Sequence, residues 1–262
     1  MYVQKVWQKV CWRRCDMGKV VVIYYHEVVE KGQGYSYQKI EKDKFEAQMR
    51  YLYEQGYKSI LFSDLDKALP EKSIIVSFDD GFRTVYEKAA PIMKKYGIHG
   101  NIYLPTKYIG TDSHFMTWEM VKELSEDKFF EMQAHTHTHI DIRRLNEQSV
   151  KEQINESDKM FQKHLERFPQ AFCMPFGTYD KKSIKLLKKE SRYNYLLGSY
   201  YGRIKSKHIS GRVLPRIGIS NNDSLELFAD KLNGKYDWKG PLQRLRLMWK
   251  NVKKERITEY EY

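Results

Sequence analysis

Short apolar segments alternate with longer amphipathic segments through most of this chain, and this alternation is the strongest limit on how it can fold. The apolar segments at residues 19–25, 73–78 and 100–104 have the length and composition of strands buried on both faces. Apolar residues in 43–55 and 147–167 recur at helical spacing. This alternation predicts an α/β fold with a parallel sheet. Because about seven strand–helix steps fit, the pattern favours a barrel over a doubly wound sheet.

The remaining elements continue this pattern between residues 19 and 235, which we expect to form a single domain. Pro91 is expected to kink a helix at 84–96, and Asn146 is expected to cap the helix at 147–167. Further helices are expected at 118–125, 181–190 and 224–232, and further strands at 57–61, 129–134, 170–174, 195–197 and 212–219.

The composition excludes several classes of protein. Of the 262 residues, 41% are hydrophobic and 14% aromatic, which is enough for a core and excludes a disordered chain. No apolar run reaches the ~18 residues that cross a bilayer, and no secretory signal is recognisable. The cysteines Cys11, Cys15 and Cys173 are too few for a disulfide framework and indicate a reducing compartment. We therefore expect a cytoplasmic protein without a transmembrane helix.

Much of the net charge of +12 lies at the two ends of the chain. Residues 1–20 carry a net charge of +4, and residues 240–262 carry +3. We expect three parts: a basic amphipathic segment at 1–18, the α/β domain at 19–235 and a basic amphipathic tail at 236–262. Both end segments place apolar residues on one helical face, namely Val3, Val6, Trp7, Val10 and Cys11 in the first, and Leu242, Leu245, Met248, Trp249 and Val252 in the second.

Two interpretations of these end segments stay open. Terminal helices commonly pack on their own domain. Basic amphipathic helices with Trp are also typical of membrane-surface segments, and we expect peripheral contact with the anionic inner face of a membrane. A nucleic acid is not expected as a partner, because no recognition module accompanies the positive charge.

A pair of carboxylates follows one of the predicted strands directly, at the end where parallel α/β folds place their chemistry. Asp79, Asp80 and Gly81 follow the strand at 73–78. Two adjacent carboxylates there are costly unless they bind a cation or share a proton. The same residues also suit a turn that caps a helix, and the motif alone favours neither interpretation.

Three histidines follow another predicted strand. His135 and His139 are four residues apart, so a helical turn would put both imidazoles on one face, where they can bind one metal ion. With Asp80 they would form a two-histidine, one-carboxylate site with open positions, as in catalytic metal centres. The spacing does not decide between Asp79 and Asp80 as the ligand. His137 stays ambiguous, and a solvated histidine-rich loop is the alternative.

Together these motifs resemble one family closely, the polysaccharide deacetylases with a NodB-homology domain, which are carbohydrate esterases of family 4. The Thr/Ser-Phe-Asp-Asp-Gly motif of that family stands here at residues 77–81, its His-Ser/Thr-x-x-His motif at 135–139, and its Pro-Tyr/Phe-Gly turn at 175–177. The resemblance covers roughly residues 19–235 and implies the distorted (β/α)7 barrel of that family.

The resemblance also implies a role for each polar residue. Asp79 is expected to be the general base, and Asp80, His135 and His139 are expected to bind the metal. A backbone N–H in the third motif is the expected donor to the oxyanion. The residues of that motif expected to line the substrate groove are Pro175, Phe176, Gly177 and Tyr179.

Two further candidates come from details of the family pattern. Tyr25-His26-Glu27-Val28 is similar to the acid motif of one branch, the biofilm poly-N-acetylglucosamine deacetylases, so His26 is the expected general acid. Taken alone, a single histidine after a strand is more often structural. The family often has Arg two residues before the Pro of its third motif, where this chain has Cys173. Because that Arg usually pairs with the base aspartate, Arg216 on a late strand is the candidate substitute.

The implied activity is removal of N-acetyl groups from an amino sugar in a polysaccharide, an oligosaccharide or a lipid-linked glycan. The expected cofactor is a divalent metal, Zn2+ first, with Co2+, Ni2+, Fe2+ or Mn2+ as alternatives. An acid such as His26 favours amide hydrolysis, because an amine anion is a very poor leaving group. The expected partner is an acetylated saccharide or glycolipid. The alternatives are an O-acetyl carbohydrate esterase and a non-catalytic carbohydrate-binding relic of the same fold.

Overall fold

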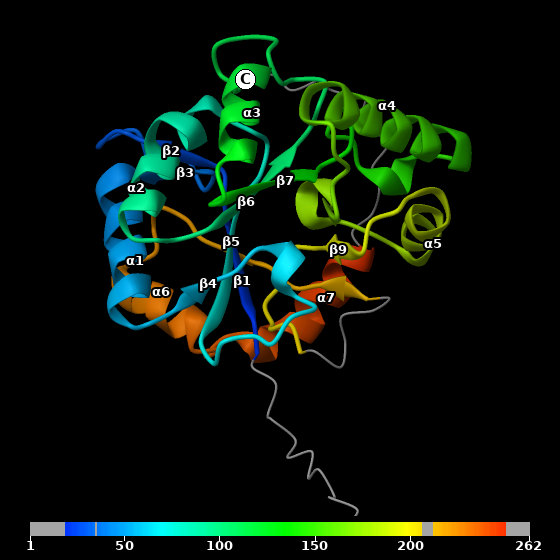
Figure 1. Ribbon diagram of the computed structural model, residues 1–262. Coiled ribbons are helices and arrows are strands. Elements are labelled where there is room, and N and C mark those ends of the chain that lie inside the picture. Colours follow the sequence, from blue (N-terminus) through cyan, green and yellow to red (C-terminus); the bar gives the residue numbers. More distant parts are fainter. Residues whose placement is uncertain (1–18, 35, 206–211, 250–262) are drawn as a thin grey trace, which may run out of the picture.

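A nine-stranded sheet lies at the centre of the computed structural model, which describes residues 19–249 without 35 and 206–211 (Figure 1). Its strands are β1 (Val21–Tyr25), β4 (Lys58–Ser59), β5 (Ser73–Phe78), β6 (Gly100–Leu104), β7 (Phe130–Ala134), β8 (Ala171–Cys173), β9 (Tyr195–Leu197), β10 (Val213–Leu214) and β11 (Ile217–Gly218). They are ordered β10–β9–β8–β7–β6–β5–β1–β11, and β4 pairs with the first residues of β5. All of these pairs are parallel, as the alternation of strands and helices predicts.

The last two strands close the sheet into a barrel. β10 and β11 lie at opposite edges of the strand order, yet only Pro215 and Arg216 separate them in the chain. The two edges must therefore meet, and the fold is the distorted (β/α)7 barrel that the sequence predicts. The continuous strand expected at 212–219 is broken at this point. Pro215 has no N–H for the ladder, and Arg216 forms an antiparallel bridge with Tyr200 instead.

Helices cover the outside of the barrel. They are α1 (Lys42–Glu54), α2 (Ala90–Lys95), α3 (Trp118–Glu126), α4 (Glu147–Leu165), α5 (Lys181–Glu190), α6 (Leu225–Leu232) and α7 (Gly240–Trp249). In Figure 1, α1, α2 and α6 lie on one side of the strands, and α4 and α5 lie on the other. Asn146 caps α4 as predicted, because its Oδ1 accepts a hydrogen bond of 2.8 Å from the N–H of Ser149.

The helix expected at 84–96 differs from the prediction. It begins as a π-helical turn, Val85–Ala89, and becomes α-helical only at α2. Pro91 in the first turn of α2 has no N–H to donate to the preceding turn. The helix therefore changes its hydrogen-bond pattern ahead of Pro91 instead of kinking within an α-helix.

The inside of the barrel is filled by apolar side chains. One buried cluster takes residues from six strands: Val22, Ile75, Tyr103, Cys173, Leu197 and Leu214. Side chains alternate between the two faces of a strand, so a cluster drawn from so many strands lies on their common inner face. With the interior filled in this way, polar side chains that point inward gather at the ends of the strands.

A small parallel sheet follows β1 and was not expected from the sequence. It consists of β2 (Glu27–Val29) and β3 (Lys39–Glu41), which pair only with each other among the described residues. Each strand has only three residues, too few to give a readable alternation. His26 lies between β1 and β2, at the junction of this small sheet with the barrel.

The basic end segments are only partly within the described residues. The predicted segment at 1–18 lies outside them, as do residues 250–262. Before that point the tail forms α7, where Gln243 Oε1 accepts a 2.9 Å hydrogen bond from the Tyr201 N–H and the Leu247 carbonyl oxygen accepts a 3.3 Å bond from Arg143 Nη1. α7 thus packs on the domain. In the part of the chain that the structure describes, no helix is both long and apolar enough to cross a membrane.

Candidate metal centre and catalytic site

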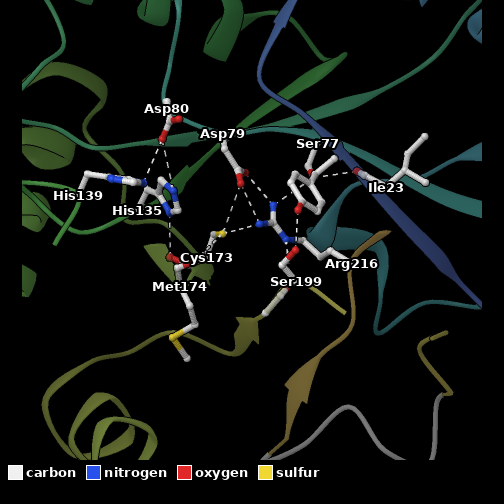
Figure 2. Close-up of polar contacts among 12 residues, drawn as sticks. Ile23, Ser77, Asp79, Asp80, His135, His139, Cys173, Met174, Ser199 and Arg216 are labelled. Atoms are coloured by element: carbon white, nitrogen blue, oxygen red, sulfur yellow. Dashed lines mark hydrogen bonds and ion pairs between the residues drawn. The ribbon is translucent and has the colours of Figure 1, made fainter. Parts of the chain in front are cut away.

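The polar residues of the sequence motifs gather at the carboxyl ends of the barrel strands (Figure 2). Asp79 and Asp80 follow β5, and His135 and His139 follow β7. Arg216 enters from the junction of β10 and β11, far along the sequence from the others. The parallel barrel therefore brings together residues from three separate parts of the chain.

Asp80, His135 and His139 converge on one point. The Nε2 atoms of His135 and His139 lie 3.5 and 3.3 Å from Oδ1 of Asp80. All three side chains are buried. Among the described residues, no donor forms a hydrogen bond with this Oδ1 atom. A buried carboxylate oxygen without a donor is costly, so the arrangement favours a bound cation.

The protonation states of this cluster also fit a metal ion. Burial lowers the pKa of His135 to about 4 and the pKa of His139 well below its usual value, so both imidazoles are neutral. Nδ1 of His135 donates a 2.9 Å hydrogen bond to the Cys173 carbonyl oxygen, which leaves the lone pair of Nε2 facing Asp80. Burial, together with the charge of Asp79, raises the pKa of Asp80 well above its usual value. A divalent cation would supply the positive charge that this set lacks.

Left-handed backbone, and not a helical turn, places these ligands. Residues 135–139 form no helix, so the conformation expected from their spacing is wrong although the two imidazoles do meet. Thr136, His139 and Asp80 have φ values of 64°, 53° and 70°. Residues with a side chain adopt this region at a cost of order 1 kcal/mol or more each. The surrounding structure therefore enforces the backbone of two of the three candidate ligands, Asp80 and His139, directly.

His137, the ambiguous member of the histidine motif, lies outside the cluster. Its Nδ1 is 2.9 Å from Thr106 Oγ1, and its backbone N–H donates a 3.1 Å hydrogen bond to Gln153 Oε1. These contacts hold the loop to neighbouring elements. The geometry thus gives His137 a structural place beside the ligand histidines.

Asp79 is bound by an arginine, whereas Asp80 lies beside the two histidines. Nη1 and Nη2 of Arg216 donate to Oδ1 and Oδ2 of Asp79 at 2.7 and 2.8 Å, a bidentate pair (Figure 2). Burial alone would raise the pKa of Asp79, but the guanidinium outweighs it and lowers the pKa well below the usual range. Asp79 is therefore ionised and fixed in orientation. Arg216 lies where the sequence predicts a cation.

Comparisons with known proteins agree with this arrangement. A family model described as "Polysaccharide deacetylase" matches residues 66–194. A Bacillus subtilis protein, YxkH, named as a candidate polysaccharide deacetylase, is 29% identical over 177 residues, which are 65% of this chain and 61% of that relative. The chain thus spans about three fifths of the length of this relative. In sequence and in fold the chain is thus similar to the polysaccharide deacetylases.

Two further relatives match more of the chain. The poly-β-1,6-N-acetyl-D-glucosamine N-deacetylase of Staphylococcus aureus is 24% identical over 231 residues, which are 81% of this chain and 77% of that protein. The crystal structure of a polysaccharide deacetylase from Bacillus cereus is 25% identical and superimposes with a TM-score of 0.73, covering 82% of this chain and 69% of that one. The barrel described above is thus the barrel of this deacetylase family.

Cys173, at the position where the resemblance predicts Arg, contacts the Asp79–Arg216 pair. Its Sγ lies 2.7 Å from Arg216 Nη2 and 3.8 Å from Asp79 Oδ2. The guanidinium of Arg216 therefore reaches Asp79 from a different strand, across the space that the shorter Cys173 side chain leaves. An arginine thus pairs with Asp79 as the resemblance predicts, but it is Arg216 and not a residue at position 173.

Asp79, His135 and Cys173 form a second group of potential ligands, whose atoms lie within 4.8 Å of one another. This group is the poorer metal site for two reasons. Arg216 already occupies Asp79, so a dication there would lie beside a guanidinium. Burial also raises the pKa of the Cys173 thiol well above its usual value, which disfavours the thiolate that binds metals.

His26 is half-buried at the edge of the site. Its ring centroid lies 5.7 Å from that of Tyr24 and 6.1 Å from that of Tyr37. Burial lowers the pKa of His26, and the charge of Asp79 partly opposes this shift. His26 is thus near enough to Asp79 to feel its charge, as a residue of the same site would.

The third motif is divided between surface and core. Pro175–Gly177 forms a short 3-10 turn in which Phe176 has a φ of 59° and a side chain that is 60% exposed, with its ring centroid 4.7 Å from that of His139. Pro175 and Gly177 are buried. Tyr179 is completely buried in the core beside α5, so the structure does not bring its side chain to the site as predicted. Phe176 is the residue of this motif that faces outward.

The aromatic residues that hold Arg216 were not identified from the sequence. The guanidinium carbon of Arg216 lies 4.4 Å from the ring centroid of Tyr24 and 5.1 Å from that of Tyr103. The Tyr24 hydroxyl is 2.5 Å from Ser199 Oγ. The sequence did contain a clue to Tyr24. It lies two residues before His26, and residues i and i+2 of an extended chain point to the same face.

Proposed function

We propose that this protein is a metal-dependent hydrolase that removes N-acetyl groups from an amino sugar in a saccharide. The observation that carries the proposal is that two adjacent carboxylates, Asp79 and Asp80, have different surroundings. Asp80 lies with two neutral histidines, and no described residue donates a hydrogen bond to its Oδ1, while Asp79 beside it is kept ionised by Arg216. The family and the N-acetylglucosamine polymer in the name of the Staphylococcus aureus relative support an acetylated saccharide as substrate.

Asp80, His135 and His139 would hold the metal, with Zn2+ as the first candidate and Co2+, Ni2+, Fe2+ or Mn2+ as alternatives. Zinc accepts a carboxylate and two imidazoles and leaves a position open for water. When bound, such an ion lowers the pKa of a coordinated water and polarises a carbonyl group. The tautomer of His135, fixed by the Cys173 carbonyl oxygen, keeps a nitrogen lone pair available to it.

Asp79 is proposed as the general base that accepts a proton from the attacking water. The bidentate contact with Arg216 keeps this carboxylate ionised and prevents its rotation. Arg216 is therefore a positioning residue. The backbone N–H of Phe176 is the proposed donor to the oxyanion, and removal of one such donor typically costs about 3–4 kcal/mol of transition-state stabilisation.

His26 is proposed as the general acid that protonates the departing amine. Its lowered pKa makes the imidazolium a stronger acid than free imidazolium. An amide needs this proton, because the amine anion is a very poor leaving group, whereas an activated ester does not. The presence of His26 in the site therefore favours N-deacetylation over the alternative of an O-acetyl esterase. The set of metal ligands, base and acid also argues against a non-catalytic relic.

The test is mass spectrometry of acetate release from matched N-acetylated and O-acetylated oligosaccharides, with the wild type and Asp79→Asn. Loss of acetyl groups from nitrogen that depends on Asp79 would support the proposal. Release from O-acetyl groups alone would identify an esterase. Saccharide binding without any release from either substrate would identify the relic.

We also propose that α7 contacts an anionic membrane surface, such as an inner membrane face. Leu242 and Leu245 of α7 are exposed, as is Trp238 in the turn before it, although α7 packs on the domain, and Arg244 and Arg246 are exposed beside them. This combination suits anionic lipid. Co-sedimentation with phosphatidylglycerol vesicles at low salt should fall when all three apolar residues are changed to Ser. Equal sedimentation of both proteins would contradict the proposal.

A further inference from the structure

Two exposed aromatic rings lie against two different histidines of the site. Phe176 packs on His139, as described above, and Tyr37 packs on His26 with an interplanar angle of 89°. The Tyr37 side chain is 72% exposed. Tyr37 belongs to the loop between β2 and β3, a part of the chain outside all the motifs identified in the sequence. Its position beside His26 therefore needs a separate explanation.

The backbone holds Tyr37 in this position. The N–H of Lys39 donates to the Ser36 carbonyl oxygen at 3.2 Å, which places Tyr37 at the second residue of a tight turn. The N–H of Glu27 donates to the Gln38 carbonyl oxygen at 3.0 Å, and this bond fixes the turn to the residue that follows His26. The turn and the histidine are therefore parts of one connected unit.

Asn221 fixes the same loop to the barrel. Its Oδ1 accepts a 3.0 Å hydrogen bond from the Glu41 N–H, and its Nδ2 donates a 3.0 Å bond to the Gly34 carbonyl oxygen. Gly34 approaches so closely that an added Cβ would lie 2.2 Å from Asn221 Nδ2. With both sides of the loop bonded in this way, the backbone that carries Tyr37 is held in place beside His26, which lowers the entropic cost of binding.

We propose that Tyr37 forms a carbohydrate subsite beside His26, in which its ring packs against the apolar C–H face of a pyranose unit of the substrate. An ordered and exposed aromatic ring is suited to such a contact, and its hydroxyl can bond a sugar hydroxyl. Partial burial and the charge of Asp80 both raise the pKa of Tyr37, so the hydroxyl stays neutral. The inference rests on the proposed function and adds a specificity-determining residue to it.

The experiment compares Tyr37→Ala and Tyr37→Phe with Tyr53→Ala, a matched control. Tyr53 is 64% exposed on α1 and has its ring near Tyr96, not near a histidine of the site. The probes are a β-1,6-linked N-acetylglucosamine pentasaccharide and 4-methylumbelliferyl acetate, a small ester without a sugar. Steady-state kinetics give kcat and KM for both, and saturation-transfer NMR gives the Kd of the pentasaccharide independently of turnover.

Tyr37→Ala is expected to raise both the KM and the Kd of the pentasaccharide about tenfold. The KM of the ester should stay near the wild-type value, because the ester has no sugar ring. Tyr37→Phe should recover most of this loss because it keeps the ring, and Tyr53→Ala should match the wild type. Equal losses on both probes, or no loss of pentasaccharide binding, would overturn the subsite. If the wild type binds the pentasaccharide through Tyr37 without deacetylating it, the proposed function fails and the subsite stands.

Discussion

Asp79 with Arg216 and Asp223 with Lys231 are two buried carboxylate–cation pairs in different regions of the molecule. The Asp223 pair is local, since the two residues are eight apart and join the loop after β11 to α6. Asp223 Oδ2 also accepts a 3.2 Å hydrogen bond from the N–H of Ser220. The Asp79 pair joins residues 137 apart in sequence, at the end of the barrel where the histidines gather.

The surroundings of the two carboxylates distinguish a structural pair from a site. Asp223 bonds to the loop and helix that it connects, so its contacts serve the local fold. Asp79 has Asp80 as its neighbour, and its charge acts on the pKa of both His135 and His139. Burial of a salt bridge is weak evidence for stability or function by itself. The neighbours of the carboxylate, and not its burial, identify the pair that belongs to the site.

The largest effect is expected at Asp80, the buried carboxylate that forms no ion pair with Lys or Arg among the described residues. Asp80→Asn and His135→Ala should each abolish metal binding and reduce deacetylation to background, whereas His137→Ala should keep most of both. Metal content by mass spectrometry and acetate release would measure this. Stoichiometric metal in a variant lacking Asp80, His135 and His139 together would rule out the ligand set.

Replacing the two paired aspartates should separate activity from stability. Asp79→Asn should lower turnover by ~10²–10⁴-fold with metal content unchanged, because the general base is lost. Asp223→Asn should leave turnover near the wild type but cost about 3–5 kcal/mol of unfolding free energy, since Lys231 loses its partner. Acetate release and urea unfolding measure the two quantities. If folded Asp223→Asn lost as much turnover as Asp79→Asn, the two pairs could not be divided into a structural pair and a pair of the catalytic site.

The two cations extend the same comparison with a smaller effect. Arg216→Met should lower kcat by about 10–100-fold and leave metal content unchanged, because Asp79 loses the group that keeps it ionised and oriented. Its activity should also decline at a higher pH on the acid side than that of the wild type, since the pKa of Asp79 is no longer lowered. Lys231→Met should keep the wild-type pH profile. An unchanged profile in Arg216→Met would argue for a merely structural role.

The ligand histidines should make the metal-free protein sensitive to acid. Burial lowers the pKa of His135 to about 4, below the unfolded value of about 6.5, so the unfolded state binds the proton more readily. The stability is therefore complete above pH ~6.5 and falls by up to about 1.4 kcal/mol per pH unit for this group as the pH decreases toward 4. Urea unfolding with EDTA between pH 7 and 5 measures the slope, which His135→Gln should reduce.

The smallest effect is expected at the thiol that faces the Arg216 pair. Burial and its raised pKa should protect Cys173 from iodoacetamide in the folded protein, and urea should expose it. The measurement needs a Cys11→Ser/Cys15→Ser background, so that Cys173 is the remaining thiol. Rapid alkylation under native conditions would show that this side of Asp79 is open to solvent.

The sequence predicted the barrel and its rim well because both depend on local patterns. The apolar segments marked the strands, and a parallel arrangement brought Asp80, His135 and His139 to one end. The conformation of 135–139 was predicted wrongly, since spacing alone does not show that Thr136 and His139 are left-handed. Arg216 was identified because a missing arginine implied a replacement.

Other features depend on tertiary packing that leaves little trace in the sequence. Tyr179 lies two residues after the Pro-Phe-Gly turn and was expected to line the substrate groove, but its side chain is buried in the core. The β2–β3 sheet is too short to show periodicity, so the position of Tyr37 beside His26 was not foreseen. A continuous strand was expected at 212–219, so neither the break at Pro215 nor its role in joining the two edges of the sheet was foreseen.

The position of Arg216 at the closure of the barrel has a consequence for how the protein is made. Asp79 and the metal ligands leave the ribosome well before residue 216, so during synthesis the nascent chain holds these acidic and imidazole groups without their guanidinium. Contacts of such high sequence separation form late and slowly. The Asp79–Arg216 pair therefore cannot form before β10 docks on β9 and β11 docks on β1, and appearance of activity during refolding would report the moment at which the barrel closes.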